Sequence, residues 1–336
     1  MTRRPGTPRR DGQRPPRFRL DHSDAGNDVA TRGLSSAATP SFQGVTKTPR
    51  QAPVGTVVPL VTLCVGLSLM TALTLRAEQA SVRMYNTAKV RLMDGGKIVG
   101  GTVSTPDPEI YCAMANAGYD FIWIEMQHSP LTFQEAARMI WACRGAPAVP
   151  FIRVPDASEG AIQKATDIGA LGIIVPMVST AEKMHTAAKY AFYPPVGERS
   201  QGGGQYRALW GNDYRETIND NLLIVAMIET VSGVDAVDAI AAVPGVDVVF
   251  AASSDLGSFS GKRQGDPQYE ALVTRIHDET LTSGRKLGGP QAWMNRDGFT
   301  FFQGPSATAL IRLGAQASLA SQRSGTAPIE GTAPQR

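Results

Sequence analysis

A regular alternation of short apolar runs and longer amphipathic stretches begins at Lys97 and continues through most of the remaining chain. Runs rich in Val, Ile and Phe predict strands, and amphipathic connections of about ten to fifteen residues predict helices. This order is typical of βαβ units with a parallel sheet. The expected strands are residues 98–104, 121–125, 149–154, 172–178, 222–228, 246–251, 286–289 and 307–313. The expected helices are residues 108–117, 133–143, 160–168, 181–191, 233–242 and 267–282, with a short seventh near 297–302.

Eight strands in this order favour an α/β fold of the (β/α)8 TIM-barrel class over residues 85–320. The alternative is an open doubly wound sheet, whose dinucleotide-binding form carries Gly-x-Gly-x-x-Gly after its first strand. Residues 103–106 read Val-Ser-Thr-Pro instead, so the barrel is preferred. In such barrels the reacting groups lie where the strands end, at the carboxyl face. The polar residues that follow the strands are therefore the candidate site residues.

The first 75 residues differ in composition from the rest. Residues 1–54 contain seven Pro and ten Lys or Arg with little apolar periodicity, which predicts a disordered basic tail. Residues 55–75 carry no charge and have the length of a membrane-spanning helix. A single membrane anchor, a targeting segment and a non-native extension all remain open for this segment. The catalytic interpretation does not depend on that choice, and it predicts a cytoplasmic protein, with single-pass membrane association as the alternative.

Charge and cysteine content limit which partners and which kinds of site this chain is expected to have. The net charge of +3 comes from the tail, so the remainder is slightly acidic and no nucleic-acid partner is predicted. The three cysteines are Cys64, Cys112 and Cys143, which form no Cys-x-x-Cys pair. Their odd number and wide spacing predict neither a disulfide framework nor a structural zinc site, which favours a reducing compartment.

Two carboxylates follow neighbouring strands. Glu229 comes directly after the apolar run 222–228, and Asp255 follows the run 246–251. Both should reach the same mouth of the barrel, where two carboxylates with open positions beside them suit a hard divalent ion such as Mg²⁺ or Mn²⁺. The alternative is that Glu229 caps a helix and Asp255 only ends a strand.

Three further polar residues belong to the same face. Arg153 ends a strand, where it either neutralises charge on a substrate oxygen or forms an ion pair within the rim. His128 follows another strand, with Glu125 three residues earlier to orient it, as a general acid–base pair would require. A structural role for His128 is the alternative. The Gly-rich segment 193–207 is expected to cover the substrate at this face, or else to be a surface connection.

With these residues identified, the chain resembles the HpcH/HpaI family of class II pyruvate aldolases. The resemblance runs from about residue 92 to 319 and rests on an ordered set of motifs: FIWIEMQHSP, VPFIRV, DIGALGIIVPMV, YPPVGERSQGG, MIETVSG and VFAASSDL. It implies that Glu229 and Asp255 bind Mg²⁺, Mn²⁺ or Co²⁺, and that Arg153 stabilises an enolate oxygen. It also implies that His128 and Glu125 transfer protons, and that backbone N–H groups of Ser254 and Asp255 bind the substrate carboxylate.

The implied reaction forms a pyruvate enolate from a 2-oxo acid, which then meets an electrophilic second substrate. The preferred version decarboxylates oxaloacetate and adds the enolate to a 2-pyrone, with Tyr206 as a hydrogen-bond donor to the pyrone. The other cleaves a 4-hydroxy-2-oxo acid to pyruvate and an aldehyde.

The sequence also departs from the family pattern. Glu125 stands where these aldolases usually have Asp, and Ala252-Ser253 replaces the usual Gly-Pro. Residues 321–336 form a polar tail where members of the family have a substantial helix, so weaker assembly into the homo-oligomer usual for the family is expected. These departures motivate an alternative of another class, an inactive barrel that serves as a scaffold.

Overall fold

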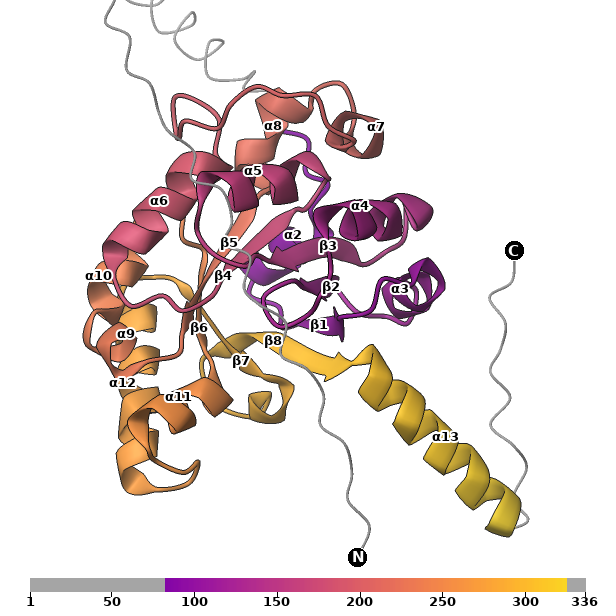
Figure 1. The fold of residues 1–336 in the computed structure, drawn as a ribbon. Coiled ribbons are helices and arrows are strands. Elements are labelled where there is room, and N and C mark those ends of the chain that lie inside the picture. Colours follow the sequence, from indigo (N-terminus) through magenta and orange to yellow (C-terminus); the bar gives the residue numbers. More distant parts are fainter. Residues whose placement is uncertain (1–81, 325–336) are drawn as a thin grey trace, which may run out of the picture. The chain divides into compact units, whose positions relative to one another are not determined.

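The structure, a computed structural model, describes residues 82–324. Eight parallel strands pair in sequence order, and β1 pairs with β8 to close the barrel, which confirms the predicted TIM-barrel fold (Figure 1). The strands are β1 (Ile98–Val103), β2 (Phe121–Glu125), β3 (Val149–Arg153), β4 (Gly172–Val175), β5 (Leu223–Ile228), β6 (Val248–Ala251), β7 (Lys286–Pro290) and β8 (Phe299–Ser306).

Helices surround the strands and carry the chain from the end of one strand to the start of the next (Figure 1). Several begin at a side-chain cap, as Thr132 does with a reciprocal hydrogen bond to Glu135. The helices are α2 (Thr87–Met93), α3 (Pro108–Ala115), α4 (Phe133–Ala142), α5 (Glu159–Asp167), α6 (Ala181–Ala191), α7 (Tyr206–Trp210), α8 (Tyr214–Asn221), α9 (Val231–Asp235), α10 (Val237–Ala242), α11 (Ser253–Ser260), α12 (Pro267–Thr282), the 3-10 turn η1 (Gln291–Trp293) and α13 (Ala307–Ser324).

Aromatic rings fill the interior of the barrel. Phe121 stacks on Phe151 at 4.5 Å and on Phe301 at 4.8 Å between ring centroids. Glycines on the strands beside two of these rings make the space for them. A Cβ on Gly100 would lie 2.1 Å from the Phe121 ring, and a Cβ on Gly172 would lie 2.2 Å from the Phe151 ring. Side chains thus fill the interior of the barrel, and any substrate-binding site must lie at one of its ends.

The end of the chain departs from the prediction. Residues 307–313 were expected to be the eighth strand and residues near 297–302 a short helix, and both assignments are wrong. The strand is Phe299–Ser306, whose aromatic residues favour β structure after a turn at Gly298, where φ is +73°. The Ala- and Leu-rich stretch that follows is a good helix former and begins α13.

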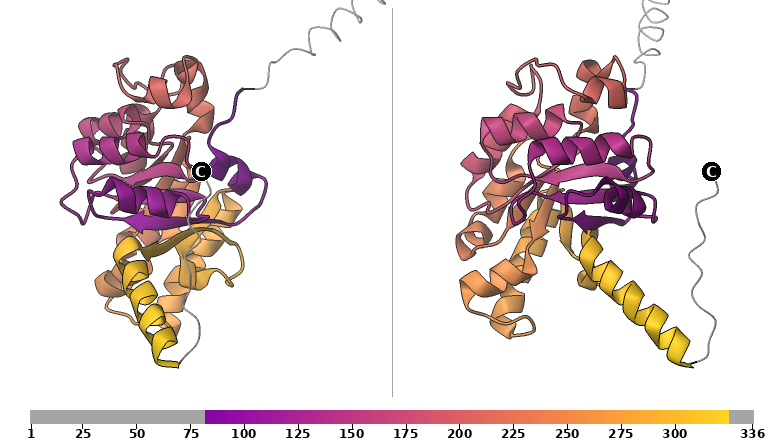
Figure 2. Two further views of the ribbon diagram at one scale, coloured as in Figure 1. Left: turned by 90° about the vertical axis from the view of Figure 1, so that its right-hand side faces the viewer. Right: turned by 45° about the vertical axis from the view of Figure 1, so that its right-hand side comes forward.

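α13 also corrects the expected lack of a final helix. It is 18 residues long and extends away from the barrel, as all three views show (Figures 1 and 2). The predicted polar tail therefore begins inside a helix, and only residues 325–336 of it lie outside the described range.

A second correction concerns the cysteines. Cys112 in α3 and Cys143 at the C-cap of α4 form a disulfide, with 5.4 Å between their Cα atoms. The prediction of no disulfide is therefore wrong, because α3 and α4 pack side by side although the two cysteines are 31 residues apart in sequence.

The expectations for the first 75 residues lie outside the described range. Between residues 82 and 324, no helix combines the length and the apolar character needed to span a membrane.

Candidate active site at the carboxyl ends of the strands

A buried ion pair joins the ends of β2 and β3. Nε of Arg153 lies 2.7 Å from Oε2 of Glu125, and both side chains are almost completely buried. The register of the two strands places these residues opposite each other. The Trp123 indole N–H also donates to Oε2 at 3.2 Å, and the backbone N–H of Gln127 donates to Oε1 at 2.9 Å. The guanidinium is therefore held at the mouth of the barrel by a carboxylate whose own oxygens are fully engaged.

Glu229 lies directly after β5 and is only 1% exposed. Burial raises the pKa of its carboxyl to about 6, and the neighbouring Asp255 carboxylate raises it further. The backbone N–H of Met177 and the cations Arg153 and Lys183 oppose this rise. Glu229 and Asp255 are thus close enough for their charges to repel, which is the arrangement that a bound cation relieves.

The donor set fits a hard divalent ion. One oxygen of Glu229 accepts the Met177 N–H, and within residues 82–324 the other, Oε1, has no hydrogen-bond partner. Neither Glu229 nor Asp255 forms an ion pair with Lys or Arg in the described range. The same range contains no group of three or more His, Cys, Asp or Glu suited to a metal. The site therefore offers two carboxylates and leaves other coordination positions open, as Mg²⁺ sites that bind substrate directly do.

A small hollow of about 130 Å³ lies beside these groups. The first residues of α11 form one wall, and the N-cap residue Ala252 makes no side-chain cap. The first N–H groups of a helix lack partners within the helix, so those of Ser254 and Asp255 are available to an anion. The lining residues are Arg153, Met227, Phe250, Ala252, Ser253, Ser254, Asp255, Pro290 and Gln303.

Sequence reasoning missed several of these lining residues. Met227, Phe250 and Gln303 lie within predicted or mispredicted strands, where alternate side chains face the barrel interior. β5 and β6 are continuous apolar runs that are buried throughout, so no alternation in the sequence marks Met227 and Phe250. Gln303 required the correct eighth strand.

His128 lies close to Glu125, although its ring is not oriented as predicted. The backbone N–H of His128, and not the imidazole, donates to Oε1 of Glu125 at 3.0 Å. The ring is exposed, and among the described residues it makes no hydrogen bond. The two residues are brought together, and the imidazole remains free to meet a substrate.

Tyr206 is not brought to this group. The Gly-rich segment follows α6 and leads into the amino end of β5, so it belongs to the opposite face of the barrel. The expectation that it covers the carboxyl face is wrong, because the loop comes after a helix and not after a strand. The Tyr206 hydroxyl donates to the Gly202 carbonyl at 2.6 Å, and its ring stacks on Tyr214.

An ion pair next to these rings attaches the loop to the rest of the protein. Arg199 is fully buried, pairs with Asp167 at 2.7 Å and lies against the rings of Tyr193, Tyr206 and Tyr214. This cluster holds the loop to the end of α5, which is a structural role.

Comparison with known proteins gives the family. The family model described as HpcH/HpaI aldolase/citrate lyase matches residues 103–292. The chain belongs to the HpcH/HpaI aldolase/citrate lyase family. The predicted resemblance is thereby confirmed, and the chain is an enzyme of carbon–carbon bond cleavage and formation, so the scaffold alternative is not supported.

Two relatives show the range of reactions in the family. Hydroxypyruvate/pyruvate aldolase of Roseovarius nubinhibens is 33% identical over 209 residues, which are 60% of this chain and 81% of that protein. 4-Hydroxy-2-oxovalerate aldolase of Novosphingobium aromaticivorans is 33% identical over 215 residues, 63% of this chain and 81% of that protein. Dependence on a divalent metal is general in the HpcH/HpaI family.

Solved structures agree with the fold. An HpcH/HpaI family protein of Burkholderia cenocepacia J2315 has a TM-score of 0.66 and 26% identity, and the match covers 71% of this chain and all of that one. Macrophomate synthase, the member that the motifs most resemble, has a TM-score of 0.62 and 24% identity, covering 74% of this chain and 92% of that one. At that identity, the second match supports the barrel fold alone.

Proposed function

We propose that this chain is a divalent-metal-dependent class II aldolase that cleaves 4-hydroxy-2-oxo acids to pyruvate and an aldehyde. The main support is that Asp255 and Arg153 line one hollow at the carboxyl ends of the strands, and that Glu229 lies close enough to both for their charges to affect its pKa. Two family relatives with 33% identity are aldolases, and one of them is named for 4-hydroxy-2-oxovalerate.

Different residues of the site would bind the metal ion and the substrate carboxylate. Glu229 and Asp255 would hold the ion, which supplies a Lewis acid that polarises the keto group. The N–H groups of Ser254 and Asp255 would receive the substrate carboxylate, because they open the α11 helix without a cap. The small volume of the hollow suits the three-carbon pyruvyl portion.

The chemical step then needs a base and a fixed cation. The His128 imidazole, beside Glu125, would take the proton from the 4-hydroxyl group as the C3–C4 bond breaks and the aldehyde leaves. The electron pair of that bond forms the C2–C3 double bond and the carbonyl π pair moves onto the keto oxygen, where Arg153 would stabilise the negative charge of the enolate. Return of a proton to C3 yields pyruvate.

The test is pyruvate release by the full-length purified protein from a 4-hydroxy-2-oxo acid, followed with added Mg²⁺ and with EDTA. Glu229→Gln should lower kcat/KM at least about a hundredfold, by analogy with the loss of a pre-organised charge contact. Glu198→Gln is the matched control, because Glu198 is an exposed carboxylate paired with Lys189 on the surface. Metal-dependent release that persists in Glu229→Gln would contradict the ligand assignment.

Decarboxylation of oxaloacetate followed by addition to a 2-pyrone is the second candidate, since it uses the same enolate site. The placement of Tyr206 removes its predicted pyrone contact, which is why cleavage of hydroxy-oxo acids is preferred. Incubation with oxaloacetate and a 2-pyrone, against a protein-free control with Mg²⁺, separates the two reactions. A benzoate product without aldehyde release would reverse the preference.

A further inference from the structure

The turn between β4 and α6 has an unusual backbone. Met177 has a φ of +52° and is the one non-glycine residue with positive φ in the described chain. The left-handed conformation of a non-glycine residue is energetically unfavourable and persists only where neighbouring contacts hold it. Something around Met177 must therefore fix this peptide.

Two opposite charges contact the two ends of this residue. The Met177 N–H donates to Oε2 of Glu229. The Met177 carbonyl accepts a hydrogen bond from Nζ of Lys183, at 3.2 Å. The residue thus lies between a carboxylate and an ammonium group, with the partially positive N–H toward the anion and the partially negative carbonyl toward the cation.

Neighbouring contacts attach the same turn to the strand that carries Glu229. The Val178 N–H donates to the Met227 carbonyl at 3.0 Å, and the Ser179 hydroxyl lies 2.8 Å from that of Thr230. These contacts join the turn to the end of β5.

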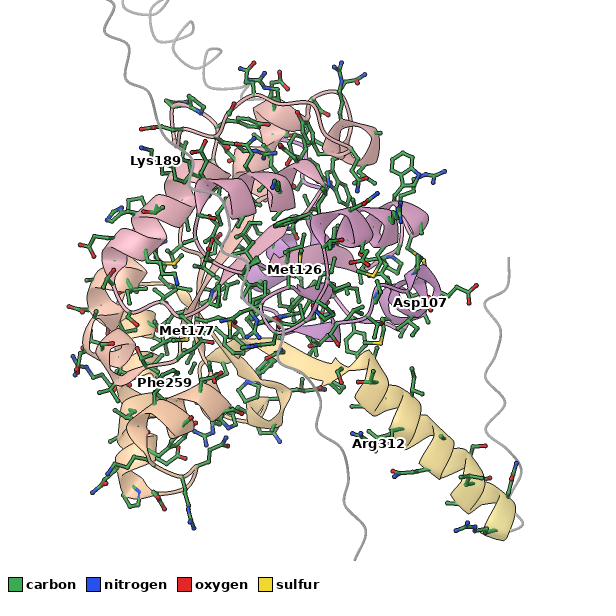
Figure 3. All side chains as sticks on the ribbon, in the orientation of Figure 1. Asp107, Met126, Met177, Lys189, Phe259 and Arg312 are labelled. Carbon is green, nitrogen blue, oxygen red and sulfur yellow. A yellow bond between two sulfur atoms is a disulfide. The ribbon has the colours of Figure 1, made fainter. Side chains whose placement is uncertain are left out.

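Lys183 stands in the first turn of α6 and is half-buried. Burial lowers the pKa of its ammonium group, while the carboxylates of Glu229 and Asp156 oppose this change. Figure 3 labels Met177 and also Lys189, which lies near the other end of α6. Lys189 is exposed and pairs with Glu198, so it is a matched cation on the same helix that does not contact the turn.

We propose that Lys183 is a positioning residue for the metal ligand Glu229, acting through the left-handed backbone conformation of Met177. Lys183 holds the Met177 carbonyl, which keeps the Met177 N–H directed at one oxygen of Glu229. The other oxygen is then presented in a fixed position, without a competing protein partner. This inference rests on the proposed function, because it takes Glu229 as a ligand of the divalent ion.

The test is Mn²⁺ affinity of the full-length protein, measured from the electron paramagnetic resonance signal of free Mn²⁺ in a titration at pH 7.5. Lys183→Met should weaken binding about tenfold, since loss of groups that orient a ligand weakens metal binding about 10- to 100-fold. Lys183→Arg should restore most of the affinity, and Lys189→Met should match the wild type. Wild-type affinity in Lys183→Met would overturn the inference.

Glu229→Gln separates this inference from the proposed function. If Glu229→Gln binds Mn²⁺ as the wild type does, the ligand assignment fails. If Glu229→Gln loses binding and Lys183→Met does not, only the role of Lys183 fails.

A second pair of variants covers the case in which Lys183→Met does not fold. Asn and Val have similar sizes, but Asn adopts positive φ far more readily than the β-branched Val. Met177→Val should therefore bind Mn²⁺ several-fold more weakly than Met177→Asn. Equal affinities in this pair would show that the backbone conformation of the turn does not position Glu229.

Discussion

The environment of Glu229 sets the pH range in which its carboxylate can bind a divalent ion. Its pKa of about 6 lies above the ordinary value because the carboxyl is buried and lies close to Asp255. A divalent ion binds the ionised carboxylate, so protons compete with the metal. In the metal-free protein the same carboxyl binds its proton more tightly in the folded state than in the unfolded chain. Its contribution to stability therefore rises as pH falls from about 6 toward 4.5.

We expect Mn²⁺ affinity to fall about tenfold from pH 7 to pH 5, because that interval spans the titration of Glu229. Titration with Mn²⁺ at several pH values measures this. Glu198→Gln should show the same profile as the wild type. A flat profile would mean that Glu229 does not bind the ion or is already ionised at pH 5.

The ion pair between Glu125 and Arg153 gives a second prediction. Arg153→Met leaves a buried carboxylate without its cation and should lower the free energy of unfolding by about 3–5 kcal/mol. Adding Glu125→Gln removes that charge and should recover much of the loss. Urea unfolding of the two variants measures the difference. Equal instability of the single and double variants would show that the pair contributes through packing alone.

Each strand brings its last residue to a common face, and this made much of the site predictable. Glu125, Arg153, Glu229 and Asp255 follow apolar runs, and parallel strands end at the same edge. The placement of Tyr206 required the order of elements as well. Its loop follows α6, and a loop after a helix returns to the opposite face.

Other parts of the site depend on contacts that no local pattern shows. Met177 and Lys183 act on Glu229 across more than 40 residues of sequence, through backbone atoms that carry no residue-type signal. The prediction of the eighth strand was wrong for a different reason. Residues 299–306 mix aromatic residues with Gly and Pro, whereas the following apolar run has the composition of a helix.

The glycine on β4 gives a prediction at the level of the strand. Gly172→Ala would place a methyl group against the Phe151 ring and should destabilise the barrel by about 1–3 kcal/mol through overpacking. Gly160→Ala is the control, because Gly160 lies in α5 with open space around the added carbon. Thermal unfolding compares the two. A Gly172→Ala protein as stable as the control would mean that the aromatic rings inside the barrel shift easily.

At the scale of the whole molecule, α13 leaves the end of β8 and carries exposed apolar side chains. Its apolar residues Ile311, Leu313 and Leu319 are each more than half exposed. Figure 3, which labels Arg312, shows that the side chains beyond the first turn of this helix stand clear of the other elements.

Replacing these three residues with Gln should change the free energy of unfolding of the isolated chain by about 0.5 kcal/mol or less for each, as for other exposed positions. Urea unfolding at low protein concentration measures this, with Phe301→Ala as a variant that must destabilise strongly. A large loss of stability from the α13 substitutions would show that the helix packs against another surface in solution. The homo-oligomer expected for the family stays a prediction.

The closure of the barrel between β1 and β8 has a consequence for where the site's charges reside. Both candidate ligands, Glu229 and Asp255, come from the second half of the chain, while Arg153 and its partner Glu125 come from the first. The second half alone would hold two neighbouring anions without the guanidinium opposite them, and the first half alone would hold no ligand. Only the closed barrel brings the two candidate metal ligands together with Arg153 and Glu125. Substrate chemistry is therefore a property of the closed ring, and separately expressed halves should regain activity only when they reassemble into it.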